Sequence, residues 1–162
     1  PLEAGLRRLA EEQRAPVTFL PKAPYRELTD LCCQADLGVM PVLPECLNSY
    51  YCSPNKMFDY MMAGLPVVAA DLPEMAALVA ECANGLLYDA YSPNDLAEAL
   101  LRLSGDPELA ARARASRQWA ESTYNWEKEG AKLVDLVRGL AERRRTRQLR
   151  PKIWVDPQIP LR

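Results

Sequence analysis

The chain has 162 residues, of which 49% are apolar and 26% charged. This length suits one globular domain with a core, and the composition excludes a disordered chain. The net charge of −2 gives no overall field that would attract nucleic acid, so no nucleic-acid partner is expected. No apolar stretch approaches the roughly 20 residues of a membrane span and no leader opens the sequence, which predicts a cytoplasmic protein.

The cysteines follow neither a disulfide nor a zinc-binding pattern. They are odd in number and include no CxxC pair, so we expect free thiols in a reducing compartment and no metal. They are Cys32, Cys33, Cys46, Cys52 and Cys82. Because the chain has no histidine, it cannot assemble a Ser-His-Asp triad or a Cys-His pair by itself.

The first forty residues alternate between helical and strand patterns. A helical pattern starts at Leu2 with no strand before it, and residue 1 is proline, so we expect the chain to be a piece of a larger protein. Residues 17–20 form a β-rich run between two prolines and predict a buried strand. A helix is expected over residues 25–34, and residues 37–40 predict a second strand that ends at a proline.

The next segment combines a loop, a helix and a strand. Two prolines and few periodic apolar positions predict a loop over residues 42–52. Ser53 and Pro54 then predict a helix start, with serine as the N-cap and proline in the first turn, and Gly64 predicts its end. Residues 66–70 predict a third strand. Apolar strands that alternate with helices indicate an α/β fold, a parallel sheet flanked by helices.

The second half of the chain is predominantly helical. Ser92-Pro93 and Asp106-Pro107 repeat the cap-then-proline start. The buried face of the first of these helices is predicted at Leu96, Ala97, Leu100 and Leu101. A long helix is expected over residues 125–145, so that residues 1–150 form the domain and residues 151–162 an extended tail.

The end of that long helix is basic, at Arg143, Arg144 and Arg145. Two interpretations stay open. These side chains contact anionic lipid at the inner membrane face or an acidic partner surface, or they are a solvated helix end whose cations complement the helix dipole.

The helix that starts near residue 53 has the best arrangement for ligand binding. Ligands of parallel sheets bind outside the carboxyl ends of the strands, where the positive ends of helix dipoles attract phosphate. Lys56 adds a charge in the first turn, and Asp59 lies one turn beyond Asn55 on the same face. This layout suits a diphosphate and the sugar hydroxyls beside it. The alternative is that Ser53 is only a cap and that Lys56 and Asp59 form a weak surface pair.

The segment from Ser53 to Val68, SPNKMFDYMMAGLPVV, resembles the donor-site motif of retaining GT-B glycosyltransferases of the group 1 type. That motif has two acidic residues separated by seven others, followed by a small residue, Gly, any residue and Pro-Val-Val. Flanking segments agree with the family in order and spacing over roughly residues 15–140. These are VTFL (17–20), Leu28, ADLGVMP (35–41), NGLLY (84–88) and YNW (124–126).

The resemblance implies the C-terminal, nucleotide-sugar-binding half of a GT-B fold, Rossmann-like and truncated at its N-terminus. It implies that Asp59 holds the ribose of the donor. The backbone of Ser53, Pro54, Asn55, Lys56 and Met57 would face the donor phosphates and sugar. No cofactor or metal is implied beyond the nucleotide-sugar substrate.

The chain departs from the family motif in three ways. Tyr51 stands where the family has its first acidic residue, and Pro54 replaces a glycine, a variant that part of the family shares. Glu45 is a candidate substitute for the missing carboxylate, with a solvated loop position as the alternative. The family's diphosphate-binding Arg and Lys are absent, because Arg7 and Arg8 lie in a helical pattern.

The resemblance therefore implies a hexose transferase that retains the anomeric configuration and acts on a saccharide or lipid-linked acceptor. The N-terminal acceptor-binding domain and the first donor-site strands are expected to be missing, so the chain alone should transfer nothing. A sugar epimerase or phosphorylase of the same fold, and a non-catalytic scaffold, stay open as alternatives.

Overall fold

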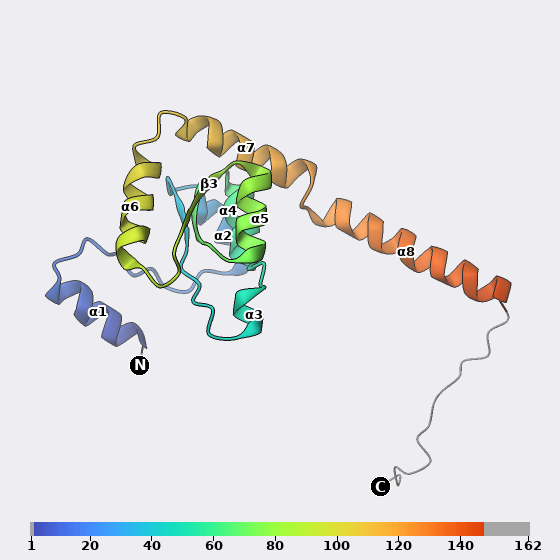
Figure 1. The fold of residues 1–162 in the computed structure, drawn as a ribbon, viewed down its shortest axis with the longest axis horizontal. Helices are drawn as coiled ribbons and strands as arrows, with labels where there is room; N and C mark the ends of the chain where they lie inside the picture. Colours follow the sequence, from blue (N-terminus) through green and yellow to red (C-terminus); the bar gives the residue numbers. More distant parts are fainter. Residues whose placement is uncertain (1, 148–162) are drawn as a thin grey trace, which may run out of the picture.

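The computed structural model describes residues 2–147, and the predicted tail over residues 151–162 lies outside this range. Helices and strands alternate through its central part (Figure 1). Within the described range, none of the helices combines the length and the apolar composition that a membrane crossing would need.

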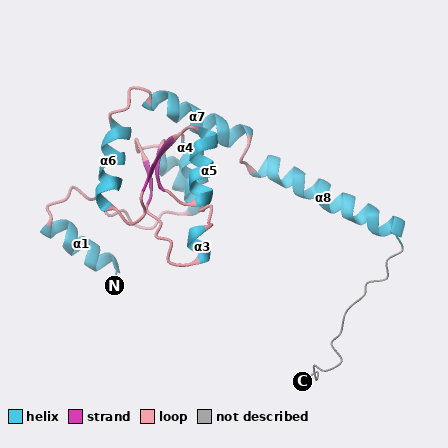
Figure 2. Ribbon diagram, viewed as in Figure 1, coloured by secondary structure: helices cyan, strands magenta, loops and turns pink. Residues whose placement is uncertain are grey.

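Three parallel strands form the sheet, which confirms the predicted parallel architecture. They are β1 (Gly38–Met40), β2 (Val67–Ala70) and β3 (Gly85–Tyr88), in the order β1-β2-β3. Val39 pairs with Val68 in the register between the first two strands. Every residue of the central strand is buried, because helices cover both sides of the sheet (Figure 2).

Two of the covering helices connect the strands on one side of the sheet, α4 (Asn55–Ala63) and α5 (Pro73–Cys82). Helix α6 (Pro93–Ser104) follows β3 and lies on the other side (Figure 1). Helix α4 ends where the sequence predicts, because Gly64 adopts a left-handed φ of 74° that favours glycine.

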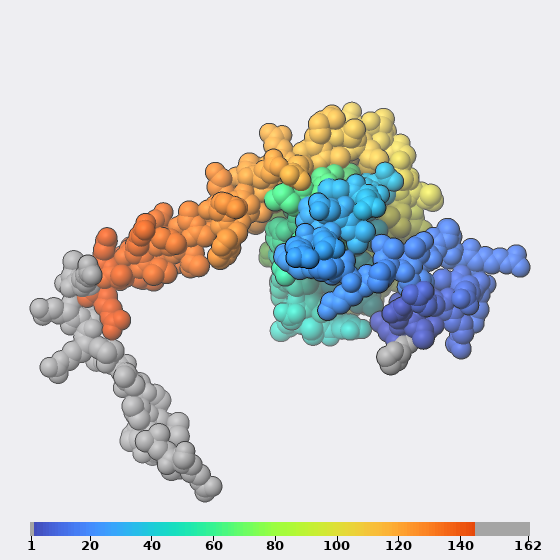
Figure 3. Space-filling model, turned by 180° about the vertical axis from the view of Figure 1, so that it is seen from behind, coloured from blue at the N-terminus to red at the C-terminus, as the bar shows by residue number. Residues whose placement is uncertain are grey.

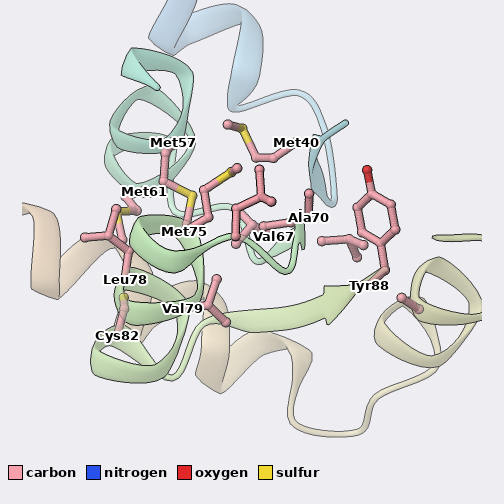
Figure 4. Close-up of a cluster of buried hydrophobic side chains, with 14 of the residues drawn as sticks. Met40, Met57, Met61, Val67, Ala70, Met75, Leu78, Val79, Cys82 and Tyr88 are labelled. Carbon is pink, nitrogen blue, oxygen red and sulfur yellow. The ribbon is translucent and has the colours of Figure 1, made fainter. Parts of the chain in front are cut away.

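Methionine side chains fill much of the space between the sheet and its helices. Met40, Met57, Met61 and Met75 are all fully buried (Figure 4). Flexible thioether chains fit irregular gaps between elements. Met57, in the first turn of α4, packs into this core and so anchors the start of the helix.

A stack of aromatic rings joins α4 to α7 (Leu109–Ser122) and to the turn that follows it. Tyr124 stacks on Trp119 at 4.2 Å between ring centroids and on Phe58 at 5.6 Å. Because Phe58 precedes Asp59, this stack holds the part of α4 that carries the predicted ribose-binding carboxylate.

Both ends of the described chain lie outside the layered core. Helix α8 (Trp126–Arg147) matches the predicted long helix and extends away from the domain (Figure 3). It exposes apolar side chains, including Leu136 at 60% and Leu140 at 55%. Helix α1 (Leu2–Glu12) is present as predicted and none of its residues is buried.

The prediction of a strand over residues 17–20 is wrong. Val17 and Leu20 are 55% and 61% exposed, and no described strand pairs with this segment. Its contact is with α1, where the Arg7 guanidinium lies 4.5 Å from the centre of the Phe19 ring. A β-rich run becomes a strand only where a neighbouring strand bonds to its amides and carbonyls.

One helix prediction and one loop prediction in the first half need correction. The helix expected over residues 25–34 is a short 3-10 turn, η1 (Tyr25–Glu27), followed by α2 (Leu28–Cys32). The segment 42–52, predicted as a loop, contains the single-turn helix α3 (Leu47–Tyr50). Helix α3 buries none of its residues, so it leaves no apolar periodicity in the sequence.

The three predicted helix starts, each a capping residue followed by proline, differ from one another in the structure. Ser92 caps α6 as expected, because its Oγ accepts the Asp95 amide at 3.1 Å. Ser53 does not cap α4. Pro54 is the N-cap there, with an extended backbone, and its carbonyl accepts the Met57 amide. The Asp106 carboxylate accepts the Glu108 amide in a turn before α7, so that helix begins only at Leu109.

The buried face of α6 is shifted from its predicted position. Leu101 is 74% exposed and Ala97 is exposed, whereas Ala99 and Leu103 are buried. Positions three and four apart share one face of a helix, so the true stripe combines Leu96 and Leu100 with Ala99 and Leu103. These are partly or fully buried against β2 and β3.

Candidate functional site

The carboxyl ends of all three strands lie at one edge of the sheet, since the strands are parallel. From the end of β1 the chain passes through α3 and reaches the start of α4. Open parallel sheets bind ligands at this edge, where helices begin after the strands.

The start of α4 has free backbone donors. Its N-cap is Pro54, which has no side-chain acceptor, so no side-chain cap hydrogen bond forms. Among the described residues, the amides of Asn55 and Lys56 have no hydrogen-bond acceptor. Ser53 is exposed, and its hydroxyl has no hydrogen-bond partner among the described residues. The absence of the predicted serine cap thus leaves these N–H groups available to an anion.

Lys56 is exposed in the first turn of α4. It has no ion pair with Asp59 or with any other carboxylate of the described residues, so the alternative of a surface pair does not form in the structure. Its ammonium group adds a formal charge to the positive end of the helix dipole.

Asp59 is a half-buried carboxylate on the side of α4 that approaches α2. No described residue bonds to its side chain, and burial raises its pKa above the ordinary value. The nearby Cys32 thiol also has a raised pKa, first through its own burial and then through the Asp59 charge. A desolvated carboxylate without a partner destabilises the fold and is typical of a ligand-binding position.

The remaining residues of the predicted site offer less to a ligand. The Met57 side chain is fully buried and its amide bonds to the Pro54 carbonyl, so it supports the helix start from within the core. Tyr51, at the place of the family's first acidic residue, is 58% exposed and makes an edge-to-face contact with Tyr50 at 4.8 Å. Glu45 is exposed in the loop before α3.

A cavity of about 490 Å³ opens at the ends of β2 and β3 and was not predicted from the sequence. Asp71 directly follows β2, and Tyr88 and Asp89 lie at the end of β3. Polar residues immediately after two apolar strands are a signal that points to this edge. Residues 85–88 were not predicted as a strand, so Asp89 was not recognised as a residue at the end of one.

The basic residues at the end of α8 lie far along the extended helix (Figure 1). Arg144 is exposed there. Helix α8 therefore places Arg143, Arg144 and Arg145 away from the edge of the sheet where the candidate site lies.

Comparisons with known proteins identify a family and a shared fold. The sequence matches the family described as Glycosyl transferases group 1 over residues 1–106. It is 36% identical over 139 residues to a D-inositol 3-phosphate glycosyltransferase of Corynebacterium urealyticum, a match that covers 83% of this chain and 31% of that relative. It is 28% identical over 143 residues to a GDP-mannose-dependent monoacylated alpha-(1-6)-phosphatidylinositol monomannoside mannosyltransferase of Corynebacterium glutamicum, covering 83% of this chain and 36% of the relative.

A solved structure shares the fold. Sucrose-phosphate synthase from Thermosynechococcus elongatus superimposes with a TM-score of 0.73 at 24% identity, over 85% of this chain and 34% of that one. The chain thus spans about a third of the length of the proteins it matches.

Proposed function

We propose that this chain, which belongs to the glycosyl transferases group 1 family, is the nucleotide-sugar-binding part of a hexose transferase. The donor is a nucleoside-diphosphate sugar, and the anomeric configuration is retained. The chain corresponds to about a third of its relatives, so we expect transfer to require the rest of a longer protein, including an acceptor-binding domain.

The observation that carries this proposal is the uncapped start of α4. The amides of Asn55 and Lys56 have no acceptor among the described residues, and the Lys56 side chain is unpaired beside them. Free N–H groups, a helix dipole and one cation together suit a diphosphate. The unpartnered Asp59 carboxylate lies one turn further, about 6 Å along the helix axis, an offset that suits the ribose of the same donor.

In the proposed mechanism the chain orients the donor and stabilises the leaving group. As the bond from the hexose to the diphosphate breaks, negative charge grows on the diphosphate oxygens. The α4 amides and Lys56 are already in position to stabilise that charge, which lowers the barrier without reorganisation during the reaction. Asp59 accepts hydrogen bonds from the ribose hydroxyls and fixes the position of the donor along the helix.

Calorimetric titration of the 162-residue chain with UDP and GDP tests the proposal. We expect saturable binding of at least one nucleoside diphosphate, weaker binding of the matching monophosphate, and no binding of the free nucleoside. A chain that kept the fold only as a scaffold would bind none of them, and that result would reject the proposed function.

The acceptor is proposed as a saccharide or a lipid-linked molecule. The names of two relatives specify D-inositol 3-phosphate and a phosphatidylinositol monomannoside, which both contain inositol. These names support an inositol-containing acceptor as the first class to test with the longer protein.

We also propose peripheral contact of α8 with anionic lipid at the inner membrane face, through Arg143, Arg144 and Arg145. The support is that exposed apolar residues, among them Leu136 and Leu140, lie on the same helix. Such a helix binds membranes through apolar burial and charge attraction. Co-sedimentation with anionic vesicles, and none with zwitterionic vesicles, is the expected result. Equal co-sedimentation with both would contradict it.

A further inference from the structure

The cavity at the ends of β2 and β3 has an unusual lining. Three carboxylates and three tyrosines contribute to it, and no lysine or arginine of residues 2–147 does. They are Tyr50, Asp71, Tyr88, Asp89, Tyr91 and Asp95. At about 490 Å³ the cavity falls within the range of small-molecule sites, and its charge disfavours a phosphate.

Tyr88 is the feature that a packing role does not explain. It is only 4% exposed, at the margin of the core cluster (Figure 4), and it also lines the cavity. Its hydroxyl has no hydrogen-bond partner among the described residues and is accessible at the cavity, not enclosed in the core. Burial raises the pKa of Tyr88, so the group stays protonated and able to donate. Phenylalanine would fill the core equally well, so the hydroxyl is the part of this side chain that is available to a ligand in the cavity.

Asp71 supplies a free acceptor directly beside Tyr88. The Asp71 amide donates to the Tyr88 carbonyl at 2.8 Å, so the two residues are neighbours across the strand ends. The Asp71 side chain is exposed and has no partner among the described residues.

The two other carboxylates of the cavity are already engaged. Asp95 accepts the amide of Asp89 at 2.5 Å, and Asp89 accepts the amide of Tyr91 at 3.0 Å. These bonds fix the backbone of residues 89–91 at the side of the cavity, whereas the side chains of Asp71 and Tyr88 remain available to a ligand.

We propose that this cavity binds a neutral saccharide, whose hydroxyl groups are held by the Tyr88 hydroxyl and the Asp71 carboxylate. A phenol that donates, a carboxylate that accepts and tyrosine rings with flat apolar faces are complementary to a sugar ring. None of the described lining residues is a cation, which disfavours the donor's diphosphate, and none belongs to the start of α4, so this is a second site. It does not rest on the proposed transferase function.

Saturation-transfer NMR of the 162-residue chain with glucose, mannose and maltose tests this site, with glucose 6-phosphate as a probe for phosphorylated ligands. Calorimetric titration with Ca²⁺ tests for a cation site. We expect at least one neutral sugar to bind, with a Kd of about 1 mM. Tyr88→Phe and Asp71→Asn should each weaken that binding by about tenfold. Tyr25→Phe, at an exposed tyrosine outside the cavity, is the matched control and should bind as the parent does.

Folding of the variants is checked separately. Because Tyr88→Phe removes an unpartnered hydroxyl, its melting temperature should equal or exceed that of the parent. No sugar binding, sugar binding that survives both cavity variants, glucose 6-phosphate binding as tight as that of glucose, or Ca²⁺ binding without sugar binding would each overturn the proposal. A nucleoside-diphosphate titration run in parallel reports on α4, so failure of one site is distinguished from failure of the other.

Discussion

The side-chain amide of Asn84 donates to the Ser116 hydroxyl at 2.9 Å, and that hydroxyl donates in turn to the Leu65 carbonyl at 3.0 Å. Asn84 and Ser116 are both fully buried. This chain of bonds joins the start of β3, the middle of α7 and the turn before β2. It connects segments that are up to 51 residues apart in the sequence.

Ser116→Ala should destabilise the fold by about 1–3 kcal/mol, because it leaves the Asn84 amide and the Leu65 carbonyl buried without partners. Urea unfolding followed by circular dichroism measures this change. Ser122→Ala, at the exposed end of the same helix, is the control and should stay within about 0.5 kcal/mol of the parent. Equal effects of the two changes would show that the buried network adds nothing to stability.

Lys56→Ala should weaken nucleoside-diphosphate binding by about 1.5–3 kcal/mol, since it removes a charge-assisted contact to phosphate. Lys22→Ala, at an exposed lysine outside α4, controls for the change in net charge. Calorimetry of both variants measures the difference. Unchanged affinity in Lys56→Ala would assign this lysine to the solvated surface.

Asp59→Asn should weaken donor binding by about 1–3 kcal/mol, because an amide offers one acceptor oxygen and no charge. A 2′-deoxy donor should bind the parent and the variant almost equally, if the 2′-hydroxyl is the main partner. Together the four affinities form a double-mutant cycle with one change in the ligand. A variant that loses stability while keeping its donor affinity would make Asp59 a structural residue.

The same substitution has a predictable pH dependence in the absence of ligand. Burial raises the pKa of Asp59 in the folded state, so the folded state holds the proton more tightly than the unfolded chain does. The stability from this group is fully present below the unfolded pKa of about 3.9 and is lost as pH rises through the folded value. Asp59→Asn should therefore be more stable than the parent at neutral pH, and the gap should close in acid. Urea midpoints measured across this range check the sign.

Gly85→Ala should destabilise the domain by about 1–3 kcal/mol or more. A Cβ at this position would overlap the carbonyl oxygen and the side chain of Val67, its partner in β2, and the paired backbone has no room to shift. Gly139→Ala is the control, because nothing surrounds that position in α8. Equal melting temperatures for the two variants would contradict this account of β3.

The 162-residue chain should show no measurable hexose transfer from any nucleotide sugar, because it corresponds to about a third of its relatives. Product formation assayed with UDP-glucose and GDP-mannose checks this. Turnover by the purified chain would show that it contains a complete catalytic unit.

The sequence alone determined the features that depend on neighbouring residues. Apolar runs near residues 37–40 and 66–70 became paired strands, Gly64 ended α4 and Ser92 capped α6. Their order indicated a parallel sheet, and the motif around Asp59 indicated the family. These signals act within one or two turns of the chain, so they are present in the sequence whatever the rest of the fold does.

The tertiary structure decided what depends on contacts between distant residues. Residues 17–20 have the composition of a strand but lack a neighbouring strand to pair with. Asp59 lost its solvation because α2 packs beside α4, and Asp71 met Tyr88 only because β2 and β3 pair in one register. Burial and strand pairing are properties of two segments brought together. The sequence could therefore place Asp59 in a motif but could not show that it would lose its solvation, or that Asp71 and Tyr88 would line one cavity.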